Sequence, residues 1–78
     1  MPKITRVCHH SPTRDDCPAL YTSDDGRLFV QGARVADADV VAQMRLPADE
    51  TMVEITPELL AMMTDPTTVQ RIGALQAT

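Results

Sequence analysis

Both cysteines and both histidines of this chain fall within one ten-residue window, from Cys8 to Cys17. The two histidines, His9 and His10, directly follow the first cysteine. Thiolate and imidazole groups are the usual ligands of zinc in proteins, and a structural zinc ion binds four ligands at tetrahedral angles. The types and number of these side chains therefore raise the hypothesis of a small zinc-stabilised domain.

The spacing of these side chains differs from that of common zinc domains. Structural zinc ligands come in pairs two to four residues apart, with a longer loop between the pairs. Here three donors are adjacent, and six residues separate the third from the fourth. Because the adjacent His9 and His10 cannot easily reach one ion together, the expected ligand set is Cys8, His10 and Cys17. A fourth ligand would come from one of the aspartates at 15–16 or from another subunit.

Two other states of the cysteines remain open. The loop between Cys8 and Cys17 is short enough for a disulfide to close, although a reducing compartment disfavours a lasting disulfide. Alternatively both thiols are free, with Cys17 packed at the base of the β-hairpin expected after it and Cys8 on a loose N-terminal arm. A cysteine nucleophile beside a histidine base is a further use of these groups. Since an irregular segment supplies neither an oxyanion hole nor a deep pocket, we expect no enzymatic activity and no catalytic residue.

Length and composition indicate one small folded domain. The chain has 78 residues, of which 44% are hydrophobic, and only one Tyr, one Phe and no Trp. So short a chain buries a small core, which must here be aliphatic with help from methionine. No apolar run approaches the ~20 residues of a membrane helix. The N-terminus also lacks the apolar stretch of a secretion signal, so we expect a cytoplasmic protein that does not contact membranes.

Charge is unevenly distributed along the chain. The net charge is −4, but residues 1–14 carry three basic residues and no acid, whereas residues 15–78 carry all eleven acids. An acidic domain should repel a phosphate backbone. Nucleic acid is therefore not the expected partner. Weak binding through the basic segment, with Lys3, Arg6 and Arg14, is kept as an alternative.

The chain divides at about residue 16. Pro12, its polar neighbours and the shift of charge predict a flexible basic arm over residues 1–16. A single domain is expected over residues 17–78.

The domain is predicted to begin with a β-hairpin over residues 19–32. Two apolar stretches flank Asp24-Asp25-Gly26, and Asp-Gly is typical of a hairpin turn because Gly tolerates positive φ. A two-residue turn would place Tyr21 opposite Val30. A three-residue turn would place Tyr21 opposite Phe29, and we favour it because it pairs two aromatic rings.

Three consecutive apolar residues in the second hairpin strand carry the functional hypothesis. Leu28, Phe29 and Val30 must point alternately to the two faces of the sheet, whereas a sheet with one covered face alternates apolar with polar residues. Both faces of this strand are therefore expected to be covered. In so short a chain the second cover would come from another subunit.

The remaining elements complete an α+β domain. Residues 33–35 either extend the second strand or bend away at the preceding glycine. A short helix is expected over residues 38–44, a strand over residues 51–55, and helices beginning at Pro57 and Pro66, each after a capping residue. The predicted order is β-β-α-β-α-α: a small three-stranded, mainly antiparallel sheet with helices on one side.

Several short motifs resemble those of small actinobacterial proteins of unknown role, such as proteins of streptomycetes encoded near helix-turn-helix regulators. The resemblance covers about residues 8–60 and rests on Cys17-Pro18-Ala19-Leu20-Tyr21, Phe29-Val30-Gln31-Gly32, Val35, Leu46-Pro47 and Glu50-Thr51-Met52-Val53-Glu54-Ile55. It implies a cytoplasmic accessory or regulatory role and assigns no active site.

The sequence therefore predicts a non-enzymatic interaction or regulatory module. It would form a homodimer or bind a protein partner through Leu28, Phe29, Val30, Met62 and Met63. The methionines either form an adaptable partner surface or fill a core that is short of aromatic rings. No cofactor is expected apart from the zinc ion of the alternative hypothesis.

Overall fold

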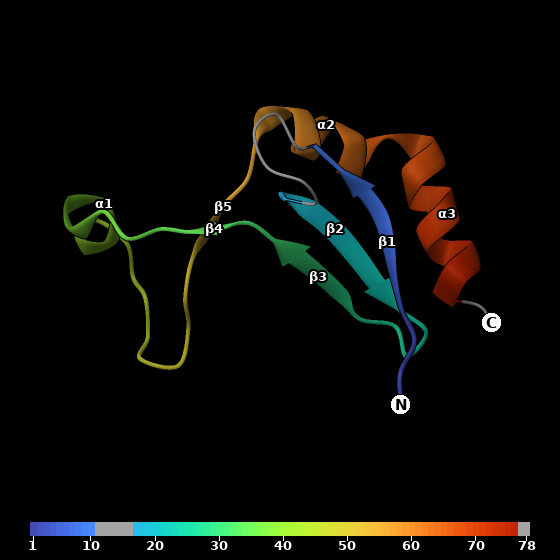
Figure 1. Ribbon diagram of the computed structural model, residues 1–78, viewed down its shortest axis with the longest axis horizontal. Helices are drawn as coiled ribbons and strands as arrows, with labels where there is room; N and C mark the ends of the chain where they lie inside the picture. The colour runs from blue at the N-terminus through green and yellow to red at the C-terminus, as the bar shows by residue number, and fades with distance from the viewer. Residues whose placement is uncertain (11–16, 77–78) are drawn as a thin grey trace.

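A computed structural model describes residues 1–10 and 17–76 and shows an α+β fold (Figure 1). The predicted fold class is therefore confirmed. None of the helices described there is both long and apolar enough to cross a membrane. The elements, in chain order, are β1 (Ile4–His9), β2 (Ala19–Ser23), β3 (Leu28–Gln31), β4 (Ala33–Arg34), α1 (Ala38–Ala42), β5 (Val53–Glu54), α2 (Pro57–Thr64) and α3 (Pro66–Gln76).

The main sheet has three antiparallel strands in the order β1-β2-β3. Its third strand is the N-terminal β1, so the expectation of an irregular arm is wrong for residues 4–9. This segment pairs with β2 along its whole length, with a bulge at Val7. The rest of the expected arm, residues 11–16, lies outside the described residues.

The predicted hairpin and its register are confirmed. Tyr21 lies opposite Phe29, as the three-residue turn requires. The Ser23 N–H donates to the Arg27 carbonyl oxygen at 3.0 Å, and Gly26 has a φ of +90°, which residues with a Cβ rarely adopt. The Asp25 carboxylate accepts hydrogen bonds from Ser23 and from Arg27, and these bonds close the turn.

The predicted strand over residues 51–55 is shorter than expected and does not join the main sheet. Only Val53–Glu54 forms β5, which pairs with β4 in a separate two-stranded sheet. At Gly32 the chain passes very close to Glu54 of β5. A residue with a side chain does not fit there, because its Cβ would collide with the Glu54 carbonyl oxygen. Residues 32–55, from this glycine through β4, α1 and β5, are called the extension below. They project away from the main sheet (Figure 1).

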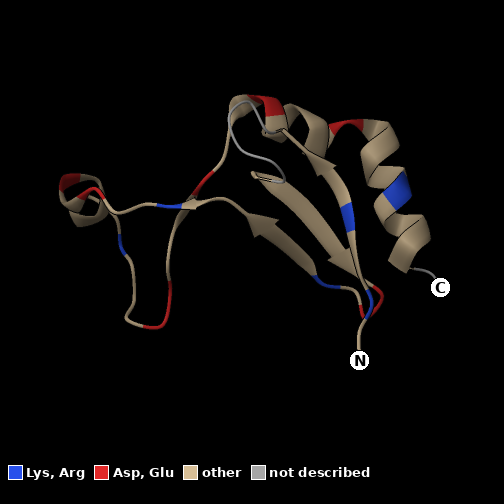
Figure 2. Cartoon of the chain, in the orientation of Figure 1, with Lys and Arg blue, Asp and Glu red and all other residues tan. Residues whose placement is uncertain are grey.

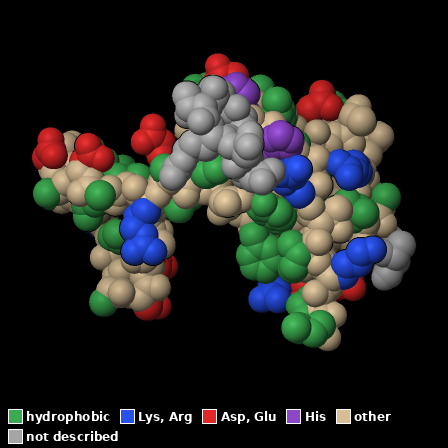
Figure 3. Space-filling view, viewed as in Figure 1, with side chains coloured by type: hydrophobic (Ala, Val, Ile, Leu, Met, Phe, Trp, Pro, Cys, Tyr) green, Lys and Arg blue, Asp and Glu red, His purple; other side chains and the backbone are tan. Residues whose placement is uncertain are grey.

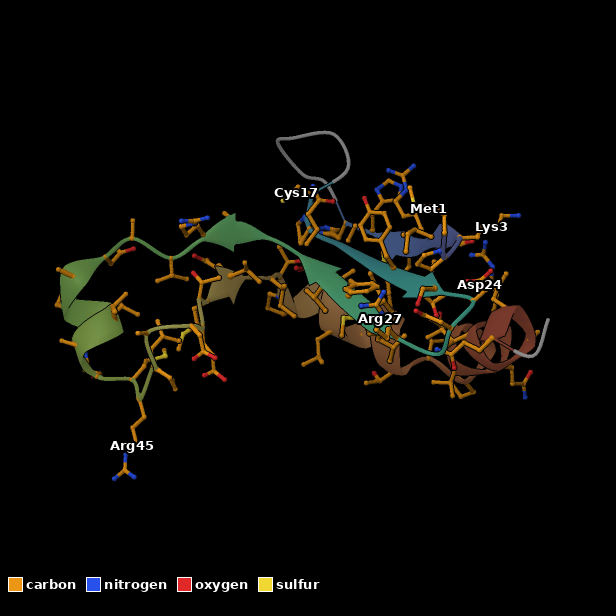
Figure 4. All side chains as sticks on the ribbon, turned by 90° about the horizontal axis from the view of Figure 1, so that it is seen from below. Met1, Lys3, Cys17, Asp24, Arg27 and Arg45 are labelled. Carbon is orange, nitrogen blue, oxygen red and sulfur yellow. The ribbon has the colours of Figure 1, made fainter. Side chains whose placement is uncertain are left out.

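Helices α2 and α3 cover one face of the main sheet (Figure 4). Thr56 caps α2 by accepting a hydrogen bond from the Leu59 N–H at 3.1 Å, and Pro57 occupies the first helical position, as predicted. The helices pack on β1 and β2 rather than on β3. Two long-range bonds fasten α3 to the strands: Arg71 donates to the Val7 carbonyl oxygen, and Gln76 donates to Thr22.

The core lies entirely beneath β1 and β2. The buried hydrophobic residues are Val7, Ala19, Leu20 and Leu59. From Asp24 to Glu58, a stretch that the structure describes completely, no residue is buried. The radius of gyration is 14.1 Å, whereas a compact domain of this length has about 11.5 Å. The extension accounts for this elongated shape (Figure 1).

Candidate interaction surface

Strand β3 is an edge of the main sheet, and all four of its residues are exposed. The exposed fractions are 55% for Leu28, 38% for Phe29 and 40% for Val30. The sequence predicted that both faces of this strand are covered. In the part of the chain that the structure describes, all of β3 stays exposed on both faces, because the helices pack chiefly on β1 and β2. The three residues predicted to bind a partner are thus at the surface.

The free edge of β3 also presents backbone hydrogen-bonding groups. Residues in an antiparallel pair alternate between hydrogen-bonded and non-hydrogen-bonded positions. Ser23 and Arg27 occupy a hydrogen-bonded position, so Tyr21 and Phe29, two residues further along each strand, occupy the next one. Leu28 and Val30 lie between these positions. Their N–H and C=O groups therefore point outward, away from β2.

The face of the main sheet opposite the helices carries a patch of aromatic and basic residues, which we call the open-face patch: Ile4, Arg6, Tyr21, Arg27, Phe29 and Gln31. Four of these residues line an open hollow, namely Ile4, Tyr21, Phe29 and Gln31. The Tyr21 hydroxyl donates to Gln31 at 2.8 Å, and the Arg27 guanidinium lies 5.1 Å from the centre of the Phe29 ring. Figure 3 shows hydrophobic side chains gathered on this face between basic ones.

The two methionines predicted at the surface lie on α2. Met62 is exposed and Met63 is half-buried. Helix α2 packs chiefly on β1 and α3, so these methionines belong to a different part of the molecule from the β3 edge. The sequence grouped them with Leu28–Val30, but the structure does not bring the two sets together on one element.

Most of the net negative charge lies on the extension. It contains two arginines and five acidic residues, a net charge of −3 out of −4. Outside it, the described residues carry four basic and four acidic side chains and are neutral overall. In Figure 2 the acidic positions gather on α1 and on the segment that leads to β5.

The predicted zinc ligands lie toward the same end of the β1–β2 pair. Cys8 is on β1 opposite Leu20, His10 directly follows β1 and donates its backbone N–H to the Pro18 carbonyl oxygen at 3.0 Å, and Cys17 directly precedes Pro18. The His10 ring shares a hydrogen bond of 3.0 Å with Thr56, the cap of α2. Both thiols are free. Among the described residues, no three or more His, Cys, Asp or Glu side chains are grouped so that they could hold a metal ion. The aspartates at 15–16 lie outside the described residues, and zinc binding stays a prediction.

The surroundings of Cys8 disfavour the thiolate form of its side chain. Burial raises the pKa of the Cys8 thiol above its usual value of 9.0, and the charge of Arg71 offsets part of this rise. We expect Cys8 to react with iodoacetamide more slowly than free cysteine at pH 7.5, because only the thiolate is nucleophilic. The rate should rise with pH past 9. Replacing Arg71 with Gln should shift this profile to still higher pH.

Peptide mass spectrometry after timed alkylation, which separates Cys8 from Cys17, measures the effect. Lys3→Gln serves as the matched control, since it also removes one positive charge but lies before β1, at the turn end of the sheet. A Cys8 that is alkylated as fast as free cysteine would contradict the burial of this thiol.

The basic N-terminal residues belong to the sheet rather than to a loose arm. The Lys3 backbone N–H donates to the Asp24 carboxylate at 3.0 Å, at the turn end of the sheet (Figure 4). Arg6 lies opposite Tyr21 and so joins the open-face patch. Arg14 lies outside the described residues. Nucleic-acid binding by these residues stays a prediction.

Two parts of this surface were missed by sequence reasoning. Ile4 and Arg6 were assigned to the arm, although the β-branched Ile4, Thr5 and Val7 are typical of a strand. The extension was not recognised as a separate body. Gly32 was the one signal for it, as the residue where the chain could bend away.

The chain was compared with protein-family models, with curated proteins and with solved structures, and none of the three comparisons found a match.

Proposed function

We propose that this chain is a non-enzymatic interaction module, an accessory or regulatory protein that binds another protein chain through the β3 edge. The observation that carries the proposal is an unpaired strand edge flanked by large apolar side chains on both faces. Such an edge is a template for an added strand: its backbone groups supply affinity, and the flanking side chains supply specificity.

The two edges of the main sheet differ in a way that favours β3 as the binding edge. Proteins protect free edges with charged residues, proline or bulges. The β1 edge has such devices within the strand, since Arg6 lies on it and a bulge interrupts it at Val7. Strand β3 has neither a charge nor a proline nor a bulge. An exposed apolar edge without protection promotes aggregation of a protein that acts alone. In a protein that binds a partner, the same edge supplies the contact.

Photo-crosslinking in cells that naturally make the protein tests this function. The photoreactive analogue p-benzoylphenylalanine in place of Phe29 should form covalent adducts on irradiation, because the ring would lie in the contact. The same analogue in place of Gln70, an exposed residue of α3, a helix that packs chiefly on β1, β2 and α2, is the matched control and should form at least tenfold less adduct. Equal yields at both positions, or no adduct at position 29, would count against the proposal.

A further inference from the structure

We infer that the partner at the β3 edge is a second copy of this chain, bound about a two-fold axis beside Phe29. The inference rests on the function proposed above and names the occupant of that same surface. Three features of the chain carry it: the register that β3 can make with itself, the position of the extension, and the distribution of charge.

Strand β3 is complementary to itself in the antiparallel direction. Leu28 and Val30 point their N–H and C=O groups outward, one residue on either side of Phe29. A two-fold axis beside Phe29 places each Leu28 opposite Val30 of the second copy, so that both pairs exchange hydrogen bonds. Contacts of this kind, in which the same patch serves both subunits, are typical of symmetric dimers. The result is one continuous six-stranded sheet.

The side chains support the same register. The two Phe29 residues face each other at a non-hydrogen-bonded position, where side chains approach most closely. Since Tyr21 lies opposite Phe29 within each chain, four aromatic rings would form a row across the open face. On the helix side, Leu28 would contact Val30 of the second copy. All three exposed apolar residues of β3 would thereby lose their contact with water.

The extension overhangs the free β3 edge. It leaves β3 at Gly32 and runs beyond the sheet, and a hollow separates it from the rest of the molecule (Figures 1 and 3). A second copy bound along β3 therefore lies in this hollow, against the extension. Among residues 1–10 and 17–76 no covering element fills it, since no residue of the extension is buried.

The extension needs such a contact for its own stability. Its elements are two strands of two residues and a helix of five residues that buries nothing. Isolated pairs of strands and helices this short are marginal in water. The extension nevertheless carries many apolar residues, which are suited to a covering surface: Val35, Val40, Val41, Met44, Leu46, Met52, Val53 and Ile55.

Charge favours a second copy over an unrelated acidic partner. The extension has a net charge of −3, and the open-face patch contains Arg6 as well as Arg27, which pairs with Asp25 at 3.2 Å. The extension of one copy is thus acidic, the open face of the other carries arginines, and each copy supplies both. This complementarity should make association weaker as salt rises.

Sedimentation equilibrium between about 1 and 100 µM tests the stoichiometry. We expect a species of about 17 kDa, twice the 8.5 kDa of one chain. Val30→Pro removes an outward N–H without breaking the ladder to β2, and edge positions tolerate proline. It should raise the dimer dissociation constant at least tenfold relative to Val30→Ala, which removes more of the side chain than proline does but keeps the N–H. Circular dichroism checks that both variants fold.

A single cysteine tests the register without relying on proline. Phe29→Cys should form an intermolecular disulfide on mild oxidation, since facing residues at a non-hydrogen-bonded position have Cα atoms about 4.5 Å apart. Mass spectrometry of the linked peptides identifies a bond between the two thiols introduced at position 29. Gln70→Cys is the control and should remain unlinked under the same conditions.

The outcomes separate this inference from the function on which it rests. A chain that stays monomeric at 100 µM would overturn the inference that the partner is a second copy. A dimer that neither forms the disulfide at position 29 nor is weakened by Val30→Pro would overturn it as well. If cellular crosslinking at position 29 then yields adducts with a different protein, the interaction function stands and only the partner is wrong. If it yields none, both proposals fall.

Discussion

Replacing Leu59 with Ala should remove a large part of the protein's free energy of unfolding. Leu59 is 0% exposed and is the largest of the fully buried side chains. It lies in the first turn of α2, directly above the strands, so its removal leaves a cavity where the helix layer meets the sheet. Leu→Ala changes at such positions cost about 2–5 kcal/mol. Domains this small have little stability to lose, because total stabilities of single domains are about 5–15 kcal/mol.

Urea denaturation followed by circular dichroism measures this loss of unfolding free energy. The adjacent Leu60→Ala is the matched control: it removes the same atoms from a side chain that is 52% exposed, and it should change stability by about 0.5 kcal/mol or less. Equal effects at both positions would show that α2 does not pack on the sheet through Leu59.

Replacing Gly32 with Ala should detach the extension while leaving the core folded. The added Cβ would collide with the Glu54 carbonyl oxygen, a backbone atom that cannot move aside as a side chain can. The pairing of β4 with β5 should therefore open. Because none of the extension's residues contributes to the core, the thermal midpoint of the core should change little.

Limited trypsin digestion measures the opening. Arg34 and Arg45 are cleavage sites within the extension, and cleavage there should become at least about tenfold faster, since proteolysis follows the population of the open form. The same variant should weaken the proposed dimer. Gly73→Ala is the control: a Cβ there meets no atom within 4 Å, and alanine in a helix stabilises it by up to about 1 kcal/mol. Unchanged cleavage in Gly32→Ala would refute the close approach.

Features set by neighbouring residues were predictable from the sequence. The Asp-Gly turn determined the hairpin, and aromatic pairing selected the register that places Tyr21 opposite Phe29. The starts of α2 and α3 followed from a capping residue before a proline. Asp37 occupies the predicted cap position of α1, although its side chain makes no capping bond there. In each case a few adjacent residues carry the energetic preference.

Features set by distant residues were not predictable in this way. Strand β1 forms because residues 4–9 pair with β2 and because Arg71, more than sixty residues away, binds the Val7 carbonyl oxygen. Basic charge and a nearby proline suggested an arm, and nothing local contradicted them. Residues 51–55 resemble a strand locally, but the extension offers them only the two residues of β4 as a partner.

The sequence selected residues for the candidate site but not their arrangement. The run of three apolar residues singled out Leu28, Phe29 and Val30, and their binding to a partner stays a prediction. Their position at an uncovered edge depends on which strands α2 and α3 cover. The sequence of β3 does not contain this information. The window from Cys8 to Cys17 was noticed through sequence proximity. Folding pairs its two ends, since His10 donates to the Pro18 carbonyl oxygen, but among the described residues it groups no three possible ligands into a metal site.

The long-range bonds that close the core imply an order of events in folding. His10 reaches Thr56, Gln76 reaches Thr22, and Arg71 reaches Val7. The two ends of the chain thus meet, and the hairpin turn and the extension form a loop between them. Contacts so distant in sequence slow folding, because the chain loses loop entropy before they form. The hairpin can form early, but the hydrophobic core must wait for α2, which carries Leu59, and the bonds from Arg71 and Gln76 must wait for α3.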